Sequence, residues 1–225
     1  MGSEGPPVTK IHVTGFTRFH GVAENPTETI VGRLKDYANK QGLPDGATPS
    51  SFHVLETAGE GALSTLHALL DSDLPSNAGT GTEFLSDSGS VERIIWLHLG
   101  VNSGASKFAV ECRALNEATF RCPDEKGWQP QRTPIVPEDG GISHAIETTL
   151  PTKEIVQALV KKGYDVVLSD DAGRFVCNYV YYHSLRYAAK HGIKSLFVHV
   201  PLFTKVDEET QMQFITSVLE VLASI

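Results

Sequence analysis

One cysteine and one histidine stand where an α/β fold can bring them together as reacting groups. Cys177 follows an apolar, strand-like run at residues 165–168 and a small polar turn, and it lies near the start of a helix-like stretch. Backbone N–H groups and the positive end of the helix dipole favour a thiolate there. His199 lies at the end of the next apolar run, residues 195–201. Because the ends of parallel strands share one edge of a sheet, we expect the thiol and the imidazole to meet. Nucleophilic catalysis by cysteine requires this pair.

Each of these residues also has a purely structural interpretation. A free cysteine is among the most buried residue types and usually only packs in the core. The chain contains nine histidines, so the position of His199 at a strand end is more informative than its presence. His98 lies inside a buried strand-like run, and we expect it to form hydrogen bonds in the core.

A third group must orient the imidazole and stabilise its charged form, as the acid does in a Ser-His-Asp triad. The chain has 27 Asp and Glu residues, and the pattern alone does not select one. Glu111 is the first candidate because it follows the apolar residues 108–110 and can point into a cavity. The alternative interpretation is that Glu111 is an acid at a strand edge that faces water. Asp124 is the second candidate for the group that orients the imidazole.

Strands and helices that could position these groups alternate along the chain. Strands are predicted near residues 10–14, 52–55, 93–99, 108–115, 165–168 and 195–201. Helices are predicted to start at 25–28, where Asn, Pro and Glu form a start signal, and to cover about 62–70, 153–162, 174–190 and 212–222. This order predicts a single α/β/α domain over residues 1–225, with a mainly parallel, twisted sheet and helices on both faces. Residues 1–9 are predicted to be a flexible N-terminus, 71–90 a mobile loop and 121–147 a long excursion over the site.

Composition excludes several classes of protein. The formal charge of −8 argues against nucleic-acid binding, which usually needs a basic face. No apolar run reaches the ~20 residues of a membrane span, and residues 1–7 do not resemble a signal peptide. Cys112, Cys122 and Cys177 are too few for a disulfide framework, and no His, Cys, Asp or Glu set has metal-ligand spacing. We therefore expect a cytoplasmic protein without a metal or membrane contact, and we leave a homo-oligomer open.

Four separated motifs resemble pyroglutamyl peptidase I, the pyrrolidone-carboxylate peptidase family of cysteine peptidases. Together, and in this order, they are specific, and the last three resemble the plant members most. They are TGFTRF at 14–19 with NPT at 25–27, ECRALN at 111–116 with Arg121 and Asp124 downstream, DAGRFVCNY at 171–179, and FVHVP at 197–201.

The resemblance implies a role for each site residue. Cys177 would be the nucleophile, His199 the general base and acid, and Glu111 the group that orients His199. Arg121 would lie near the oxyanion. The residues expected to enclose the five-membered lactam of the substrate are Phe16, Phe19, Val176, Phe175 and Cys122. The implied reaction removes an N-terminal pyroglutamate from peptides through a thioester and needs no cofactor.

The chain also departs from the bacterial members of this family. Arg18 and His20 replace Pro and Gly in the first loop, residues 101–104 replace a Gln-containing segment, and Cys112 replaces an arginine. Two other functions are therefore weighed. One is a different cysteine amidohydrolase on the same scaffold, and the other is a non-catalytic binding protein that retains the fold.

Overall fold

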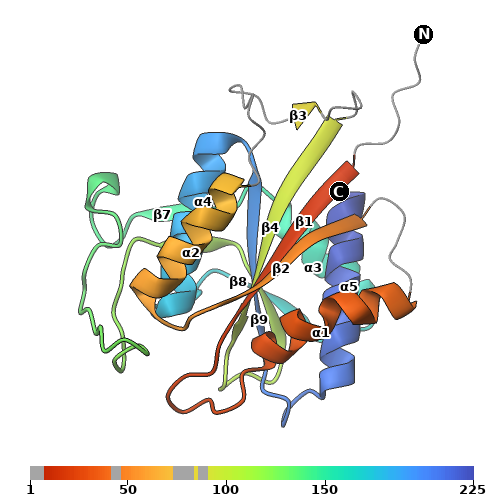
Figure 1. The fold of residues 1–225 in the computed structure, drawn as a ribbon, viewed down its shortest axis with the longest axis horizontal. Helices are drawn as coiled ribbons and strands as arrows, with labels where there is room; N and C mark the ends of the chain where they lie inside the picture. Colours follow the sequence, from red (N-terminus) through yellow and green to blue (C-terminus); the bar gives the residue numbers. More distant parts are fainter. Residues whose placement is uncertain (1–7, 42–46, 73–83, 86–90) are drawn as a thin grey trace.

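A central mixed β-sheet organises the molecule, with strand order β2-β1-β4-β9-β5-β8 and β3 paired to β4 (Figure 1). The computed structural model describes residues 8–41, 47–72, 84–85 and 91–225. The strands are β1 (Val8–Phe16), β2 (Ala47–Leu55), β3 (Phe84–Leu85), β4 (Val91–Val101), β5 (Phe108–Glu111), β8 (Val166–Ser169) and β9 (Lys194–Val200). Strands β2, β1, β4 and β9 are parallel, which confirms the predicted, mainly parallel sheet.

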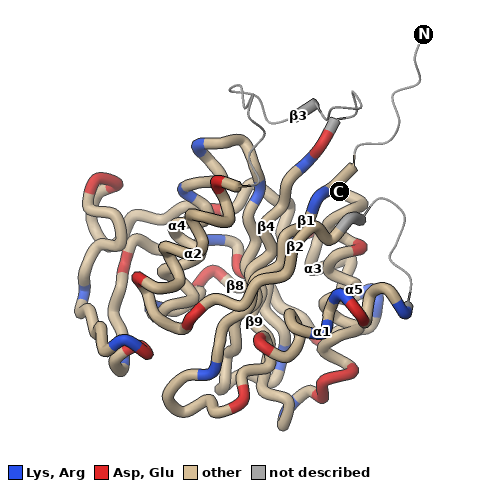
Figure 2. Tube along the Cα trace, viewed as in Figure 1, with Lys and Arg blue, Asp and Glu red and all other residues tan. Residues whose placement is uncertain are grey.

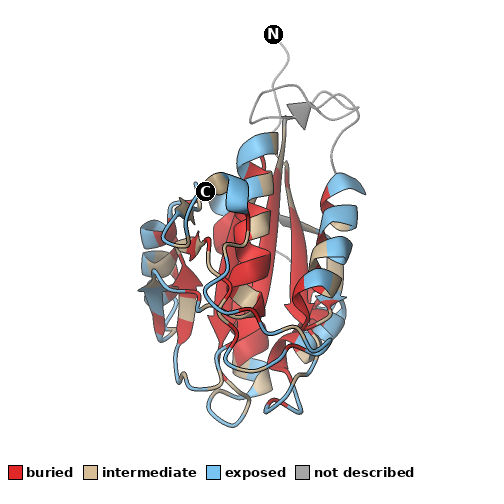
Figure 3. Ribbon diagram, turned by 90° about the vertical axis from the view of Figure 1, so that its left-hand side faces the viewer, coloured by how far each residue is buried: buried red, intermediate tan, exposed pale blue. Residues whose placement is uncertain are grey.

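Helices cover both faces of this sheet (Figures 1 and 3). Helices α1 (Pro26–Gln41), α3 (Thr152–Lys161) and α5 (Glu208–Ser224) share one apolar core with one face of the sheet. Helices α2 (Gly59–Ser72) and α4 (Val176–His191) share a second core with the other face. Strands β4 and β9 lie between the two cores and are buried on both sides, so their sequences are almost continuously apolar. The predicted α/β/α arrangement is confirmed.

Strands β5 and β8 run against the direction of the other long strands. β5 pairs antiparallel with β9 and parallel with β8. The ends of β8 and β9 therefore do not share one edge, so the prediction that parallel strand ends bring Cys177 and His199 together is wrong. Ser169, the last residue of β8, is level with Glu111, which is level with Phe197 in β9. Cys177 and His199 meet because residues 170–175 lead the chain from the end of β8 back to the edge where β9 ends.

The predicted strand at 108–115 is two strands that belong to different sheets. β5 ends at Glu111, and β6 (Arg113–Leu115) pairs antiparallel with β7 (Ala145–Glu147). The excursion at 121–147 therefore ends in a strand, and it also contains a short 3-10 helix, η1 (Pro137–Asp139).

The two segments predicted to be flexible are partly regular. β1 begins at Val8, so residues 8 and 9 are not a loose end, and α2 continues to Ser72. Phe84–Leu85 pairs with β4. The rest of both predictions, at residues 1–7, 73–83 and 86–90, lies outside the described residues.

Charged residues of both signs are interspersed over the helices and loops around the sheet (Figure 2). Within the part of the chain that the structure describes, no helix is long and apolar enough to cross a membrane.

Candidate active site

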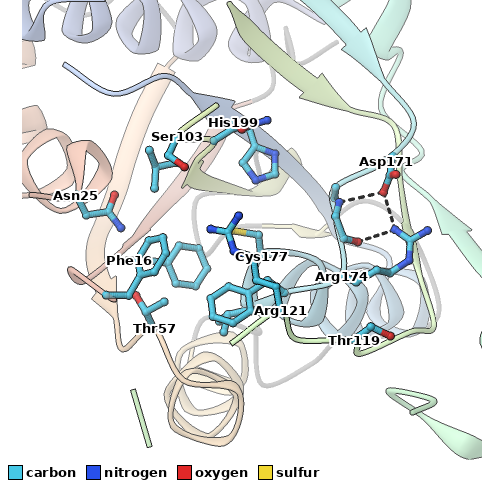
Figure 4. Close-up of a pocket in the computed structure, with 17 residues that line it drawn as sticks. Phe16, Asn25, Thr57, Ser103, Thr119, Arg121, Asp171, Arg174, Cys177 and His199 are labelled. Atoms are coloured by element: carbon cyan, nitrogen blue, oxygen red, sulfur yellow. Dashed lines mark hydrogen bonds and ion pairs between the residues drawn. The ribbon is translucent and has the colours of Figure 1, made fainter. Parts of the chain in front are cut away.

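A cavity of about 350 Å³ opens at the edge where β1, β4 and β9 end (Figure 4). Its walls include Phe16 from β1, Val101 from β4, His199 from β9 and Cys177 from α4. The carboxyl ends of parallel strands are where α/β sheets bind ligands. The structure therefore brings the predicted thiol and imidazole into one cavity.

Cys177 is the second residue of α4. The helix begins at Val176 after Phe175, and its first backbone hydrogen bond runs from the N–H of Tyr179 to the carbonyl of Phe175. The N–H groups that precede it have no acceptor within the helix. Gly173 has a φ of +79°, a value that favours glycine, in the turn that leads into α4. The sulfur thus lies beside free N–H groups and the positive helix end, which both favour negative charge.

His199 is held by Glu111. The Nδ1 of His199 donates a hydrogen bond of 2.7 Å to Oε1 of Glu111, and both side chains are buried. In the antiparallel pairing of β5 and β9, His199 is opposite Ala109. Glu111 is two residues further along β5 and therefore points to the same face of the sheet. The hydroxyl of Tyr181 donates to the carbonyl of Glu111 at 2.9 Å, which fixes this end of β5.

The surroundings of His199 favour its protonated form. Burial lowers the pKa of the imidazole, but hydrogen bonds and charge interactions with Cys177 and Glu111 outweigh it and raise the pKa well above its usual range. A protonated ring next to the sulfur in turn stabilises a thiolate. The geometry and the charges thus suit a thiolate–imidazolium pair, which is the reactive form of a nucleophilic cysteine.

Arg121 supplies a cation at the same cavity. Its guanidinium extends toward Cys177 in Figure 4. Within the described residues, no hydrogen bond or ion pair engages this side chain, and it is exposed. A free cation at this point can stabilise an oxyanion that forms on a substrate carbonyl.

Aromatic rings form one wall of the cavity. Phe16, Phe19 and Phe175 all line it. The ring centroids of Phe19 and Phe175 are 6.0 Å apart, and Phe175 also packs against Phe120 at 4.7 Å. Val176 is fully buried and also borders the cavity. This wall suits a flat, uncharged group.

Two other candidates from the sequence lie elsewhere. Cys122 is a half-buried, free thiol that is not part of the cavity wall. The carboxylate of Asp124 accepts hydrogen bonds from the backbone N–H groups of Gly59, Lys126 and Trp128, at 2.8–3.0 Å. It therefore holds the loop at 124–128 and the start of α2 together, and Glu111 is the acid that reaches His199.

The cavity wall also contains polar residues to which no catalytic or substrate-binding role was assigned from the sequence. They are Asn25, Thr57, Asn102, Ser103, Thr119, Asp171 and Arg174. Asn25 lies in the motif at 25–27, and Asp171 and Arg174 lie in the motif at 171–179. These motifs supported the resemblance, but the three residues themselves received no role at the site. Nothing in the pattern around Thr57 or Thr119 could have identified them, because both lie in loops whose paths depend on tertiary contacts.

His98 has the structural role that was predicted for it. Its Nδ1 is 2.7 Å from Oγ1 of Thr14, and its Nε2 is 2.8 Å from Oγ of Ser184. Ser184 continues this buried chain to Oγ of Ser195 at 2.8 Å. Burial lowers the pKa of His98 to about 3, so the ring is neutral at physiological pH. Among the described residues, no group of three His, Cys, Asp or Glu side chains could hold a metal ion.

Comparisons with known proteins show which family this chain resembles. A family model described as pyroglutamyl peptidase matches residues 66–218. The pyrrolidone-carboxylate peptidase of Pyrococcus furiosus is 32% identical over 194 residues, which cover 85% of this chain and 80% of that protein. The protein of the same name from Klebsiella pneumoniae is 34% identical over 192 residues, covering 84% of this chain and 76% of its own. A crystal structure of a mutant pyrrolidone carboxyl peptidase from P. furiosus superimposes with a TM-score of 0.76 at 28% identity, over 96% of this chain and 98% of that one.

Proposed function

The chain belongs to the pyroglutamyl peptidase family, and from this premise we propose that it is a cysteine exopeptidase that removes N-terminal pyroglutamate from peptides. The observation that carries the proposal is the hydrogen bond between His199 and Glu111 at the cavity that also contains the Cys177 sulfur. A buried carboxylate, an imidazole and a thiol in this order form the constellation of a cysteine hydrolase.

In the first half of the proposed reaction, the Cys177 thiolate attacks the carbonyl carbon that joins the pyroglutamyl group to the peptide. The lactam carbonyl does not react. The oxyanion that forms is stabilised by the guanidinium of Arg121 and by free N–H groups at the start of α4. His199 gives its proton to the nitrogen of the leaving peptide, and the C–N bond breaks. The shortened peptide leaves, and a pyroglutamyl thioester remains on Cys177.

In the second half, water replaces the peptide. The now neutral His199 takes a proton from the water as the water oxygen attacks the thioester carbonyl. The C–S bond breaks, free pyroglutamate departs, and Cys177 and His199 return to the ion pair. Glu111 keeps Nδ1 of His199 protonated throughout, so that Nε2 is the nitrogen that exchanges protons with the reactants.

The cavity wall supports selection of a lactam. A pyroglutamyl ring is compact, flat and uncharged, and it can fit between Phe16, Phe19 and Phe175. The charged amino terminus of an ordinary peptide would lose its water at this apolar wall without gaining a partner. We propose that this difference is the source of specificity.

The test compares three fluorogenic amides that differ only in their acyl group: pyroglutamyl, prolyl and alanyl. The prolyl amide is the sharpest control because it keeps the five-membered ring but replaces the lactam by a charged amine. We expect turnover of the pyroglutamyl amide alone, and none by Cys177→Ala. Equal turnover of all three would favour a different cysteine amidohydrolase, and turnover of none would favour the non-catalytic binding protein.

We further propose that the whole chain acts as one domain in the cytoplasm. Both apolar cores pack on a single sheet, and all the groups invoked above come from one chain. The three cysteines are free, as is usual in a reducing compartment.

A further inference from the structure

One segment of the chain, residues 115–119, lies in sequence between two groups of the proposed reaction. Glu111 precedes it by four residues, and Arg121 follows it by two. The same segment contacts the start of α4, the helix that carries Cys177, through three separate interactions. We refer to these three interactions as the clamp.

The first interaction of the clamp is made by Asn178, which is fully buried next to Cys177. Its Oδ1 accepts a hydrogen bond of 2.9 Å from the N–H of Leu115. Its Nδ2 donates to the carbonyls of Leu115 and Glu117, at 2.8 and 3.0 Å. The side-chain amide therefore binds the segment as the backbone of a neighbouring strand would, and its donors and acceptor are all used.

The other two interactions are made by Arg174, three residues before Cys177. Its Nε donates to Oε2 of Glu117 at 3.0 Å, and its backbone carbonyl accepts from the N–H of Thr119, also at 3.0 Å. The Nη1 of Arg174 holds Oδ1 of Asp171 as well (Figure 4). Glu117 is fixed in turn, because Thr119 donates to its Oε1 at 2.8 Å. The ion pair is only about a quarter exposed on the arginine side, so solvent screens it less than a surface pair.

We propose that Asn178 and Arg174 are positioning residues, which fasten the start of α4 to residues 115–119 and thereby hold the Cys177 sulfur in register with Arg121 and His199. This inference rests on the proposed function, because only the reaction explains why the position of the sulfur matters. The clamp uses none of the reacting atoms. Asn178 does not line the cavity, and its amide is bonded to the backbone of residues 115 and 117. Arg174 borders the cavity, but its Nε and Nη1 are engaged with carboxylates. Its effect on the reaction is therefore indirect, through the place of the sulfur.

Glu117 and Arg174 provide the decisive variants, since removal of the buried amide of Asn178 could unfold the protein. Arg174→Met and Glu117→Gln each remove the ion pair while keeping a side chain of similar length. Arg186→Met is the matched control: Arg186 lies on α4, the helix that carries Cys177. Its Nε forms an ion pair of 2.9 Å with Asp139, and neither residue lines the cavity. Three quantities are measured: kcat and KM for a pyroglutamyl aminocoumarin, the alkylation rate of Cys177 by iodoacetamide at about pH 6, and the melting temperature.

A displacement of the sulfur by a fraction of an ångström is costly, because misplacement by about 1 Å can reduce a rate by about a hundredfold. We expect Arg174→Met and Glu117→Gln to lower kcat at least about tenfold, with KM changed less than about twofold. Alkylation at about pH 6 should slow because the sulfur moves away from the imidazolium. The double variant should be no worse than either single variant, Arg174→Lys should recover part of kcat, and Arg186→Met should match the parent.

Unchanged kcat and alkylation in Arg174→Met would overturn the proposal. So would an equal loss in Arg186→Met, or a loss of kcat that only follows a lowered melting temperature. The alkylation assay needs no pyroglutamyl substrate. If the parent hydrolyses no pyroglutamyl amide, the proposed function fails, while the alkylation rates still decide whether the clamp positions the sulfur.

Discussion

Gly100 leaves the space that the sulfur of Cys177 occupies. Gly100 lies on β4 directly opposite His199 on β9. A Cβ atom at this position would lie 2.9 Å from Sγ of Cys177 and 2.7 Å from the ring of Phe197. Both distances are shorter than ordinary contacts between such atoms, and the ring of Phe197 is held in the core. The missing side chain of Gly100 is therefore a condition for the meeting of sulfur and imidazole.

Gly100→Ala should inactivate the protein more than it destabilises it. The new methyl group must displace either the sulfur or the ring, so we expect kcat for a pyroglutamyl amide to fall at least about a hundredfold. Overpacking should lower the free energy of unfolding by about 1–3 kcal/mol. Gly32→Ala is the control, because its new Cβ meets nothing within 4 Å beyond its chain neighbours and the adjacent backbone of its own helix. An active Gly100→Ala variant would mean that the sulfur is not held at this place.

Iodoacetamide should react with Cys177 before it reacts with Cys112. The imidazolium of His199 and the positive end of α4 favour a thiolate at Cys177. Burial, together with the charge of Glu147, raises the pKa of the Cys112 thiol. At neutral pH we expect the peptide containing Cys177 to be alkylated at least about tenfold faster, as followed by mass spectrometry. Equal labelling of the two cysteines would count against an activated nucleophile.

Glu111→Gln should move the alkaline limit of activity to lower pH. The reaction needs the proton of His199 for the leaving amine, and activity is therefore lost as pH rises through the pKa of that ring. Interactions with Cys177 and Glu111 raise this pKa above its usual range against the effect of burial. Removal of the carboxylate charge lowers it, so the alkaline limb of kcat/KM shifts downward, and kcat falls by roughly a hundredfold or more. An alkaline limb that does not move would contradict the assigned role of Glu111.

His98 should make the protein sensitive to acid. Its pKa is about 3 in the folded state because of burial, against about 6.5 for an exposed histidine. Below about pH 6.5 the unfolded chain therefore binds a proton that the folded chain does not, and stability falls as pH decreases. The contribution is at most about 1.4 kcal/mol per pH unit.

A His98→Gln variant separates this effect from that of other groups. It should be less stable at pH 7 by about 1–3 kcal/mol, since it disturbs two buried hydrogen bonds. Its stability should nevertheless fall less steeply than that of the parent between about pH 6.5 and 4. Chemical unfolding at several pH values measures both quantities. Parallel curves for variant and parent would show that His98 does not titrate between the two states.

The sequence predicted which elements exist better than it predicted their directions. Alternation of apolar runs with amphipathic stretches indicated the layers, and buried runs such as 93–99 indicated the central strands. An apolar run does not encode its direction, and the excursion at 121–147 hides how the chain returns to the sheet. The chain already reverses between β4 and β5, at residues 102–107, and no pattern there marks the change of direction. For these reasons the reversal of β5 and β8 was missed. The break after Glu111, where one predicted strand becomes two, was also missed. Residues 108–115 contain no glycine or proline that would mark the end of a strand.

The candidate site followed from chemistry more than from geometry. Cys177, His199 and Glu111 were identified by residue type, local context and resemblance. The structure places Cys177 and His199 at one cavity and hydrogen-bonds the buried Glu111 to His199. Cys122 was assigned to the pocket by resemblance alone, and it does not line it. The clamp could not be predicted, since it depends on the distance between α4 and residues 115–119, which no local pattern records.

The most direct measurement is mass spectrometry of the protein after acid quenching during turnover of a pyroglutamyl ester. We expect one added pyroglutamyl group, located on the peptide that contains Cys177, and none in Cys177→Ala. Turnover without any adduct on Cys177, or an adduct on Cys112 or Cys122 instead, would contradict this expectation.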